Sequence, residues 1–139
     1  MILTMYDELV NNGFDIVVGS RYVKGGKYEG WPLTRRLISK MGNGLAGLLL
    51  GLDVKDSMTG LFALKKDLIK NLSFEAIGYK ILLEILVKTK GAKVKEVPYT
   101  DHGPTSRIGG SSKFSFSIIN DYFKLLKILR KTASYNTKN

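Results

Sequence analysis

The fold is indicated first by one stretch, Phe14-Asp15-Ile16-Val17-Val18-Gly19-Ser20-Arg21. Its β-branched, almost wholly apolar middle is typical of a strand buried inside a parallel sheet. Such a strand requires neighbours on both sides, and few strands remain downstream to supply them. We therefore expect an α/β chain that begins mid-fold and is only marginally folded on its own.

Shorter signals on either side of this strand predict the remaining elements. Apolar residues at helical spacing, glycine stops and a proline at a helix start mark the helices, and short or alternating apolar runs mark the strands. The expected helices cover residues 2–11, 33–50, 67–72, 79–89 and 114–131, and the other strands cover 61–64 and 93–99. Loops are expected at 22–30, 53–60 and 100–113, and residues 132–139 are expected to form a disordered tail.

Two of these helices have the composition of membrane-surface helices. Residues 44–52 are apolar all round, which suits either a protein core or a lipid interface. Residues 114–131 form a basic amphipathic helix. No apolar run approaches the ~18 to 20 residues of a transmembrane helix, so we expect a peripheral protein.

The net charge is +10, from 22 Lys and Arg against 12 acids in 139 residues. Such a charge favours phosphate-rich partners: nucleic acid, anionic lipid or phosphorylated small molecules. A basic surface without a specific partner explains the charge alone equally well. The absence of cysteine excludes disulfides and thiolate metal sites, and the single histidine, His102, cannot build a histidine metal site by itself.

Two clusters of basic residues are candidates for phosphate binding. Arg21 follows the buried strand, and ligands of open α/β sheets gather at the carboxyl ends of strands. Arg35, Arg36 and Ser39 lie in the first turns of the 33–50 helix, where a bound anion would offset the repulsion between the arginines and the helix dipole. For Arg21 taken alone, a surface arginine is the slightly better interpretation, and for the second cluster a solvated helix face has about equal weight.

Two further clusters lie in expected loops. Asp56-Ser57-Met58-Thr59-Gly60 is able to bind sugar hydroxyls, orient a cation or close a turn, and taken alone the turn is the better interpretation. Arg107-Ile108-Gly109-Gly110-Ser111-Ser112-Lys113 offers Arg, Ser and Lys donors beside glycines whose N–H groups can close on an anion. The glycine spacing is not that of a Walker loop, and a flexible basic loop is the alternative.

In their order along the chain, these clusters resemble the second half of the polyprenyl-phosphate (dolichol-phosphate) mannose synthases, within the family 2 glycosyltransferases. Six blocks carry the resemblance, at residues 15–22, 30–39, 56–62, 78–84, 96–99 and 107–113. It covers nearly the whole chain, from the opening helix to Leu129. It implies that residues 1–131 are the C-terminal portion of a GT-A-like, Rossmann-related α/β glycosyltransferase domain with amphipathic interface helices.

The resemblance also implies an activity and a set of site residues. Enzymes of this type transfer mannose from GDP-mannose to a polyprenyl (dolichyl) phosphate, with inversion, at the cytoplasmic face of a membrane. The implied catalytic residues are Arg21, Asp56 and Arg107. The donor phosphates or sugar would be bound by Arg21, Arg35 and Ser39, and the acceptor phosphate by Arg107, Ser112 and Lys113.

The chain also departs from the family pattern. The family binds a divalent cation, Mg or Mn, through an Asp-x-Asp-like motif in the preceding half, and no Asp-x-Asp occurs here. Leu61 stands before Phe62, where the family pattern passes from glycine directly to phenylalanine. We therefore expect no metal site in this chain, and activity only with a partner, either a separate N-terminal half or a homo-oligomer.

Two other functions stay open at this point. A catalytically inactive module that binds lipid phosphate at the membrane surface fits the charge and the helices, but it leaves Arg21, Arg35 and Ser39 without a purpose. Nucleic-acid binding explains the charge but not the order of the motifs. Because the aromatic–basic platform of the common RNA modules is also missing, no nucleic-acid partner is expected.

Overall fold

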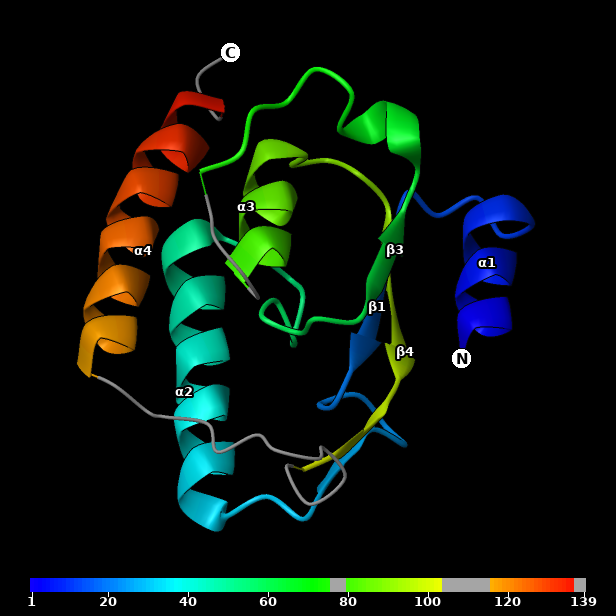
Figure 1. Cartoon of the computed structure of the whole chain (residues 1–139). Coiled ribbons are helices and arrows are strands. Elements are labelled where there is room, and N and C mark those ends of the chain that lie inside the picture. The colour runs from blue at the N-terminus through cyan, green and yellow to red at the C-terminus, as the bar shows by residue number, and fades with distance from the viewer. Residues whose placement is uncertain (76–79, 104–115, 137–139) are drawn as a thin grey trace.

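The computed structural model describes residues 1–75, 80–103 and 116–136, and Figure 1 shows its elements. In chain order they are α1 (Ile2–Val10), β1 (Ile16–Ser20), β2 (Lys27–Glu29), α2 (Leu33–Leu50), β3 (Phe62–Leu64), η1 (Lys66–Leu68), α3 (Ile81–Lys88), β4 (Val94–Pro98), β5 (Thr100–His102) and α4 (Phe116–Asn136). The protein is α/β, as predicted, and β1 lies at its centre.

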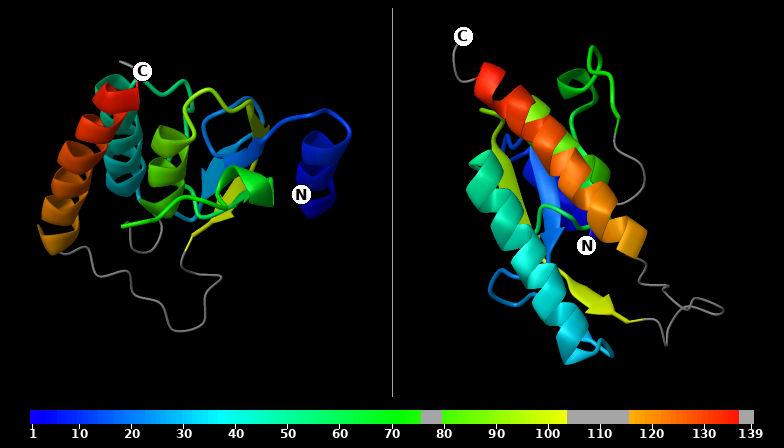
Figure 2. Two further views of the ribbon diagram at one scale, coloured as in Figure 1. Left: turned by 90° about the horizontal axis from the view of Figure 1, so that it is seen from above. Right: turned by 90° about the vertical axis from the view of Figure 1, so that its left-hand side faces the viewer.

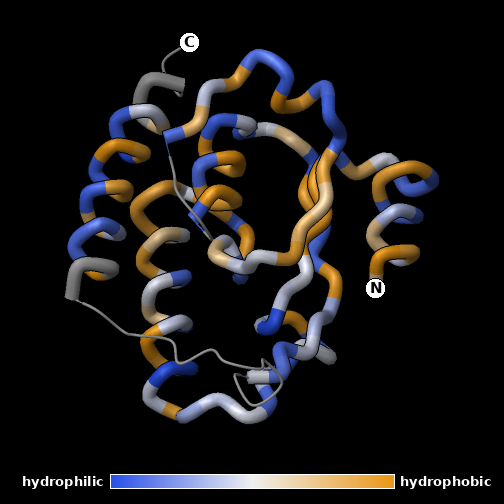
Figure 3. Tube along the Cα trace, viewed as in Figure 1, coloured by the Kyte–Doolittle hydropathy of each residue, from blue (hydrophilic) through white to orange (hydrophobic). Residues whose placement is uncertain are grey.

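The sheet is built around β1. This strand pairs antiparallel with β3 and parallel with β4, so the strand order is β3-β1-β4. All five residues of β1 are buried, and Figure 3 shows the apolar centre of the sheet. The expectation that β1 lacks neighbours is wrong, because the chain returns along one side of it as β3 and along the other side as β4.

Helices cover both faces of the sheet (Figure 2). Successive side chains of a strand point to opposite faces, and β1 follows this rule. Ile16 and Val18 pack against Leu82 of α3 in one core cluster. Val17 packs with Met5 of α1 in another. One face of the sheet therefore carries α3, with α2 and α4 beyond it, and the other face carries α1.

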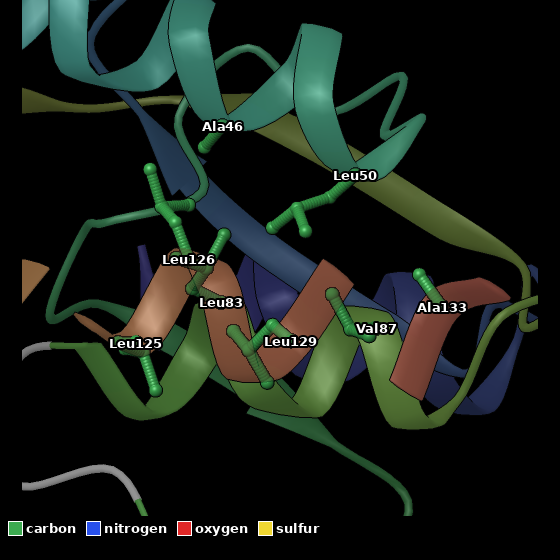
Figure 4. Packing of buried hydrophobic residues seen from close by; sticks show 8 residues of the cluster. All are labelled: Ala46, Leu50, Leu83, Val87, Leu125, Leu126, Leu129 and Ala133. Carbon is green, nitrogen blue, oxygen red and sulfur yellow. The ribbon is translucent and has the colours of Figure 1, made fainter. Parts of the chain in front are cut away.

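A third core cluster joins α2, α3 and α4 (Figure 4). Its buried members are Ala46, Leu50, Leu83, Val87, Leu125, Leu126, Leu129 and Ala133. Burying one such leucine contributes about 1.5–3 kcal/mol. Gly51 ends α2 with a left-handed φ of 63°, which glycine adopts without strain. The apolar 44–52 segment, expected to face either a core or a lipid interface, has Leu50 buried in this core and Leu48 exposed.

α2 and α4 carry exposed apolar side chains. They are Leu33, Leu37, Ile38, Met41 and Leu48 on α2, and Ile119, Phe123 and Ile128 on α4. Exposed lysines such as Lys40 and Lys127 stand among them. Across the three described ranges, no helix has the length and hydropathy that crossing a bilayer requires.

The other predicted helices and strands are present, but the helix expected at 67–72 is wrong, because only the three-residue 3-10 helix η1 forms there, and two short strands were missed. β2 and β5 lie inside predicted loops and pair with each other in parallel. Each has three residues, and the two are far apart in the sequence, so neither has a strong local signal. α4 continues past residue 131 into the segment expected as a tail, because Ala133 packs against the core that joins the three helices. Residues 137–139 of the expected tail lie outside the described residues.

Candidate functional site

The centre of the site is an ion pair between Arg21, at the carboxyl end of β1, and Asp56, in the loop before β3. Nε of Arg21 donates to Oδ2 of Asp56 at 2.7 Å, and Nη2 donates to Oδ1 at 2.7 Å. The backbone N–H of Arg21 donates to the same carboxylate at 3.0 Å. The Arg21 side chain is 13% exposed and that of Asp56 is 0% exposed, so this two-point pair is shielded from water and fixed in orientation.

Asp101 holds the other side of the guanidinium. Nη1 of Arg21 donates to Oδ2 of Asp101 at 3.1 Å. Burial acts to lower the pKa of Arg21, but the hydrogen bond and the charge of Asp56 outweigh it and raise this pKa above its ordinary value. The two acids use three of the five N–H groups of the guanidinium. At most two are left to reach a ligand.

The loop that carries Asp56 is fixed from two sides. Glu96 of β4 accepts hydrogen bonds from two backbone N–H groups of the loop, at 3.0 and 3.1 Å. Asn43 of α2 accepts a hydrogen bond from the Oγ of Ser57 at 3.0 Å. The interpretation of this segment as a simple turn is therefore incomplete, because the loop is built to hold the Asp56 carboxylate against Arg21.

Three hydroxyl groups form a cluster next to Arg21. Oη of Tyr22 lies 2.7 Å from Oη of Tyr28, and each lies 2.9 Å from Oγ of Ser39. The Arg21 guanidinium lies 4.8 Å from the centroid of the Tyr28 ring, within the range of a cation–π contact. Burial raises the pKa of Tyr28 above its ordinary value, so this hydroxyl stays protonated. The two tyrosines therefore connect Ser39 to Arg21.

The start of α2 brings two more arginines to the site. Cζ of Arg35 lies 4.1 Å from the centroid of the Trp31 ring. Nη2 of Arg36 donates to the backbone carbonyl of Tyr28 at 3.1 Å. Within the described part of the chain, Nε1 of Trp31 and Nε of Arg36 are buried without a hydrogen-bond partner. Buried donors normally have partners, so these two N–H groups are exceptions among the described residues.

A cleft of about 1040 Å³ extends from these polar groups along the space between α2 and α4. Its polar end is lined by Arg21, Tyr28, Trp31, Arg35, Ser39 and Asp101. Its apolar walls include Ile38, Met41, Leu45 and Leu48 from α2, and Ile119 and Phe123 from α4. Tyr122 joins the two helices, since its hydroxyl donates to the carbonyl of Gly42 at 2.6 Å. The cleft therefore has one charged end and an apolar length.

The structure brings together four of the predicted site residues. Arg21 and Asp56 are in direct contact, and Ser39 joins them through the hydroxyl cluster. Arg35 lines the same cleft. The three residues expected to bind the acceptor phosphate lie outside the described residues, and they are Arg107, Ser112 and Lys113. Their segment follows β5, which carries Asp101 into the site.

Sequence reasoning missed Tyr22, Tyr28 and Asp101 as site residues. Tyr28 and Asp101 are opposite each other in the β2–β5 pair. Asp101 is 80 residues from Arg21 in the sequence, and the pairing of these two short strands is what brings it there. The run Lys27-Tyr28-Glu29, polar–aromatic–polar between glycine-containing turns, is a weak signal that β2 exists.

The described residues do not fit a divalent cation. Asp101, which lines the cleft, and the buried Asp56 both direct their carboxylates at Arg21, whereas Mg²⁺ needs oxygens that converge on one open position. In the ranges that the structure covers, no three His, Asp or Glu side chains gather as ligands. A divalent cation is therefore not assigned to these residues.

The chain is similar to several curated proteins. It is 44% identical over 126 residues to the dolichol-phosphate mannosyltransferase of Pyrococcus furiosus, and the match covers 89% of this chain and 35% of the relative. The undecaprenyl-phosphate mannosyltransferase of Micrococcus luteus is 34% identical over 112 residues, covering 77% and 45%. The polyprenol monophosphomannose synthase of Mycolicibacterium smegmatis is 33% identical over 119 residues, covering 82% and 44%. No protein-family model matches the chain.

These matches confirm the resemblance and limit it. The chain spans less than half the length of each of these relatives. The Pyrococcus match covers 89% of this chain. The unmatched remainder is too short to extend from either end of the chain to Arg21 or Asp56, so the match includes the site around these two residues. The chain is therefore a homologue of the dolichol- and polyprenyl-phosphate mannosyltransferases, and it corresponds to part of their length.

Proposed function

We propose that this chain forms the acceptor-binding part of an enzyme that transfers mannose from GDP-mannose to a polyprenyl (dolichyl) phosphate. The observation that carries the proposal is the cleft, with Arg21, Arg35 and Ser39 at its polar end and the apolar walls of α2 and α4 beyond. The apolar walls match the long chain of a polyprenyl phosphate, and the polar end would hold the donor phosphates or sugar at the place where the lipid phosphate has to meet them. The names of the relatives, which specify mannose and polyprenyl phosphates, support this assignment.

The reaction requires little acid–base catalysis. An oxygen of the acceptor phosphate attacks the anomeric carbon of mannose, the bond from that carbon to the GDP oxygen breaks, and GDP leaves with the electron pair. The attacking oxygen is already anionic, so no general base is needed. The protein must bring two polyanions together and stabilise the charge on the leaving diphosphate.

Arg21, Arg35 and Ser39 are proposed to contact the donor phosphates or the transferred sugar. Arg21 keeps its charge and has up to two N–H groups left for this task. Because Asp56 is fully buried against Arg21, we assign it a positioning role near the reacting centre. The acceptor phosphate is assigned to Arg107, Ser112 and Lys113, in the segment that follows β5.

The cytoplasmic membrane surface is the proposed location of the reaction. The exposed apolar residues of α2 and α4 that do not line the cleft, such as Leu37 and Ile128, would enter the lipid interface. Exposed lysines on α4, such as Lys124 and Lys127, would attract anionic headgroups. This orientation would let a lipid chain leave the cleft directly into the bilayer.

The experiment measures transfer of labelled mannose from GDP-mannose into an organic-extractable lipid, with polyprenyl phosphate and Mg²⁺ or Mn²⁺ present. The chain is assayed alone and together with the segment that precedes the matched region in the Pyrococcus relative. We expect transfer with both parts present and none with either part alone. A divalent cation would then be held by the added segment, in keeping with the absence of Asp-x-Asp here.

Two outcomes would overturn parts of this proposal. Transfer by the chain alone would show that its own residues complete the active site. Absence of transfer under every condition, together with retained binding to vesicles that contain polyprenyl phosphate, would reject the enzyme and leave a lipid-phosphate-binding module.

A further inference from the structure

The two acids that hold Arg21 differ in their access to the cleft. Asp101 is one of the residues that line the cleft, and its side chain is 11% exposed. The side chain of Asp56 is 0% exposed, so a molecule in the cleft cannot reach its carboxylate. A ligand at this end of the cleft therefore meets Arg21 and Asp101 together, and it does not meet Asp56.

The two acids also bind the guanidinium with different geometry. Asp56 accepts hydrogen bonds from Nε and from Nη2 of Arg21, both at 2.7 Å, which is the two-point contact that makes arginine–carboxylate pairs strong. Asp101 accepts at one point, from Nη1 at 3.1 Å. The contact with Asp101 is the longer and the less constrained of the two, so it is the one that another anion can displace.

A phosphate bound to Arg21 needs the nitrogen that Asp101 contacts. Arginine binds phosphate best through two parallel hydrogen bonds. Because Asp56 already takes the N–H of Nε, a second two-point contact has to include Nη1. The carboxylate of Asp101 lies on this same nitrogen, so a phosphate at Arg21 is brought next to a like charge.

Asp101 also sets the charge at this end of the cleft. Arg21 and its two acids carry one positive charge against two negative charges. Arg35 adds a second cation to the cleft lining, with its guanidinium over the Trp31 ring. Without the charge of Asp101, the group around Arg21 would be neutral. The arginine that is proposed to bind phosphate thus carries a charge that opposes phosphate binding.

The place of Asp101 in the fold allows its carboxylate to be displaced. Asp101 is the middle residue of β5 and lies opposite Tyr28 of β2. Backbone hydrogen bonds hold β5, such as the one from the N–H of Gly103 to the carbonyl of Glu29 at 2.7 Å. The Asp101 side chain can therefore turn away from Nη1 without loss of the strand pairing, while Asp56 keeps the guanidinium of Arg21 in place.

We propose that Asp101 competes with bound phosphate for Arg21, and so limits how tightly the cleft holds a diphosphate. The inference rests on the proposed function, in which Arg21 contacts the donor phosphates. A transferase of this kind has to release the nucleoside diphosphate that its donor leaves behind, and product release limits the rate of many enzymes. Arg21 and Arg35 together would retain a diphosphate, and the charge of Asp101 offsets this retention.

Calorimetric titration of the whole chain with inorganic pyrophosphate, without metal ions, tests the competition. We expect Asp101→Asn to bind pyrophosphate about tenfold or more tightly than the wild type, because the amide keeps the shape of the side chain and removes the like charge. Asp67→Asn is the matched control. It removes the same charge, but Asp67 is exposed on η1, near the amino end of β1 (Figure 1). Its affinity should equal that of the wild type within about twofold, since solvent screens exposed charges.

Two further measurements separate competition from a purely structural role of Asp101. Urea titration should show that Asp101→Asn is less stable than the wild type, so its stability and its affinity for pyrophosphate should change in opposite directions. Asp101→Glu keeps the charge and should bind pyrophosphate no more tightly than the wild type. Geranyl phosphate, a phosphate monoester with a short polyprenyl chain, is titrated in parallel to distinguish the acceptor phosphate from the donor phosphates.

Several results would overturn the proposal. They are weaker or unchanged binding of pyrophosphate by Asp101→Asn, no binding by either protein, equal tightening by Asp67→Asn, and tightening by Asp101→Glu. Tightening for geranyl phosphate alone would also overturn it, because the competing phosphate would then be that of the acceptor. Failure of the proposed function gives a different result: mannose transfer is absent under every condition, while Asp101→Asn still binds pyrophosphate more tightly.

Discussion

The two ends of β1 carry the same kind of interaction in different surroundings. Before the strand, Nζ of Lys65 lies 3.0 Å from Oδ1 of Asp15, and the two side chains are 46% and 29% exposed. After the strand, Nε of Arg21 lies 2.7 Å from Oδ2 of Asp56, and the two side chains are 13% and 0% exposed. Both pairs tie β1 to a segment that flanks β3.

Access of water separates the two pairs. Solvent screens an exposed pair, which is worth about 0–1 kcal/mol. Breaking a buried pair by removing one partner leaves an uncompensated buried charge and costs much more. The buried pair is also at the carboxyl end of the strand, where open α/β sheets bind ligands. The end of β1 with the buried pair is therefore expected to contribute much more to stability than the end with the exposed pair, and it is also the end with the proposed ligand site.

Arg21→Ala should have the largest effect. It leaves the fully buried Asp56 carboxylate without its partner, and we expect the free energy of unfolding to fall by about 3–5 kcal/mol in urea titrations. Mannose transfer, assayed with the added segment, should be abolished. Arg130→Ala removes an exposed arginine from α4 and should change the stability by about 0.5 kcal/mol or less. Equal stability of the two variants would contradict the role of burial.

Asp101→Asn should have a smaller effect on the same end of the strand. The amide oxygen still accepts a hydrogen bond from Nη1 of Arg21, but the charge is lost, and we expect a loss of about 1–2 kcal/mol. Asp53→Asn, at an exposed loop position, is the matched control. A loss as large as that of Arg21→Ala would mean that Asp101, and not Asp56, anchors the guanidinium.

Asp56 and Asp101 show how much of the site could be predicted from the sequence. Asp56 belongs to a block that carries the resemblance, and its partner Arg21 follows a clear buried strand, so Asp56 and Arg21 were both predicted to be site residues. Asp101 was not, because it enters the site through β5, a strand of three residues that exists by pairing with β2. Local pattern predicted α1 to α4 and the strands of the three-stranded sheet, whereas β2 had only a weak local signal and its pairing with β5 had none.

Tyr28→Phe tests the hydroxyl cluster beside Arg21. The ring stays in place beneath the guanidinium, and the lost hydroxyl should cost about 1 kcal/mol. Transfer activity should fall with it, because Ser39 loses one of the two groups that orient it. Ser39→Ala should give a similar loss, and the double variant should lose less than the sum of the two. Strict additivity would show that the hydroxyls do not act together.

Asp15→Asn should have the smallest effect, and its pH dependence tests the other end of the strand. The backbone N–H of Lys93, and then the side chain of Lys65, hold the pKa of Asp15 below its ordinary value of 3.8. A depressed folded-state pKa stabilises the protein above the unfolded-state pKa, and this contribution is lost as the pH falls through the folded-state pKa. The wild type should therefore exceed the variant by about 1 kcal/mol or less at pH 7, and the difference should vanish in acid and shrink in high salt. Urea titrations at pH 7 and at pH 2.5, with and without salt, measure it. A difference that grows in acid, or that equals the loss in Arg21→Ala, would remove the distinction between the two ends of β1, because it would make the exposed pair as important as the buried one.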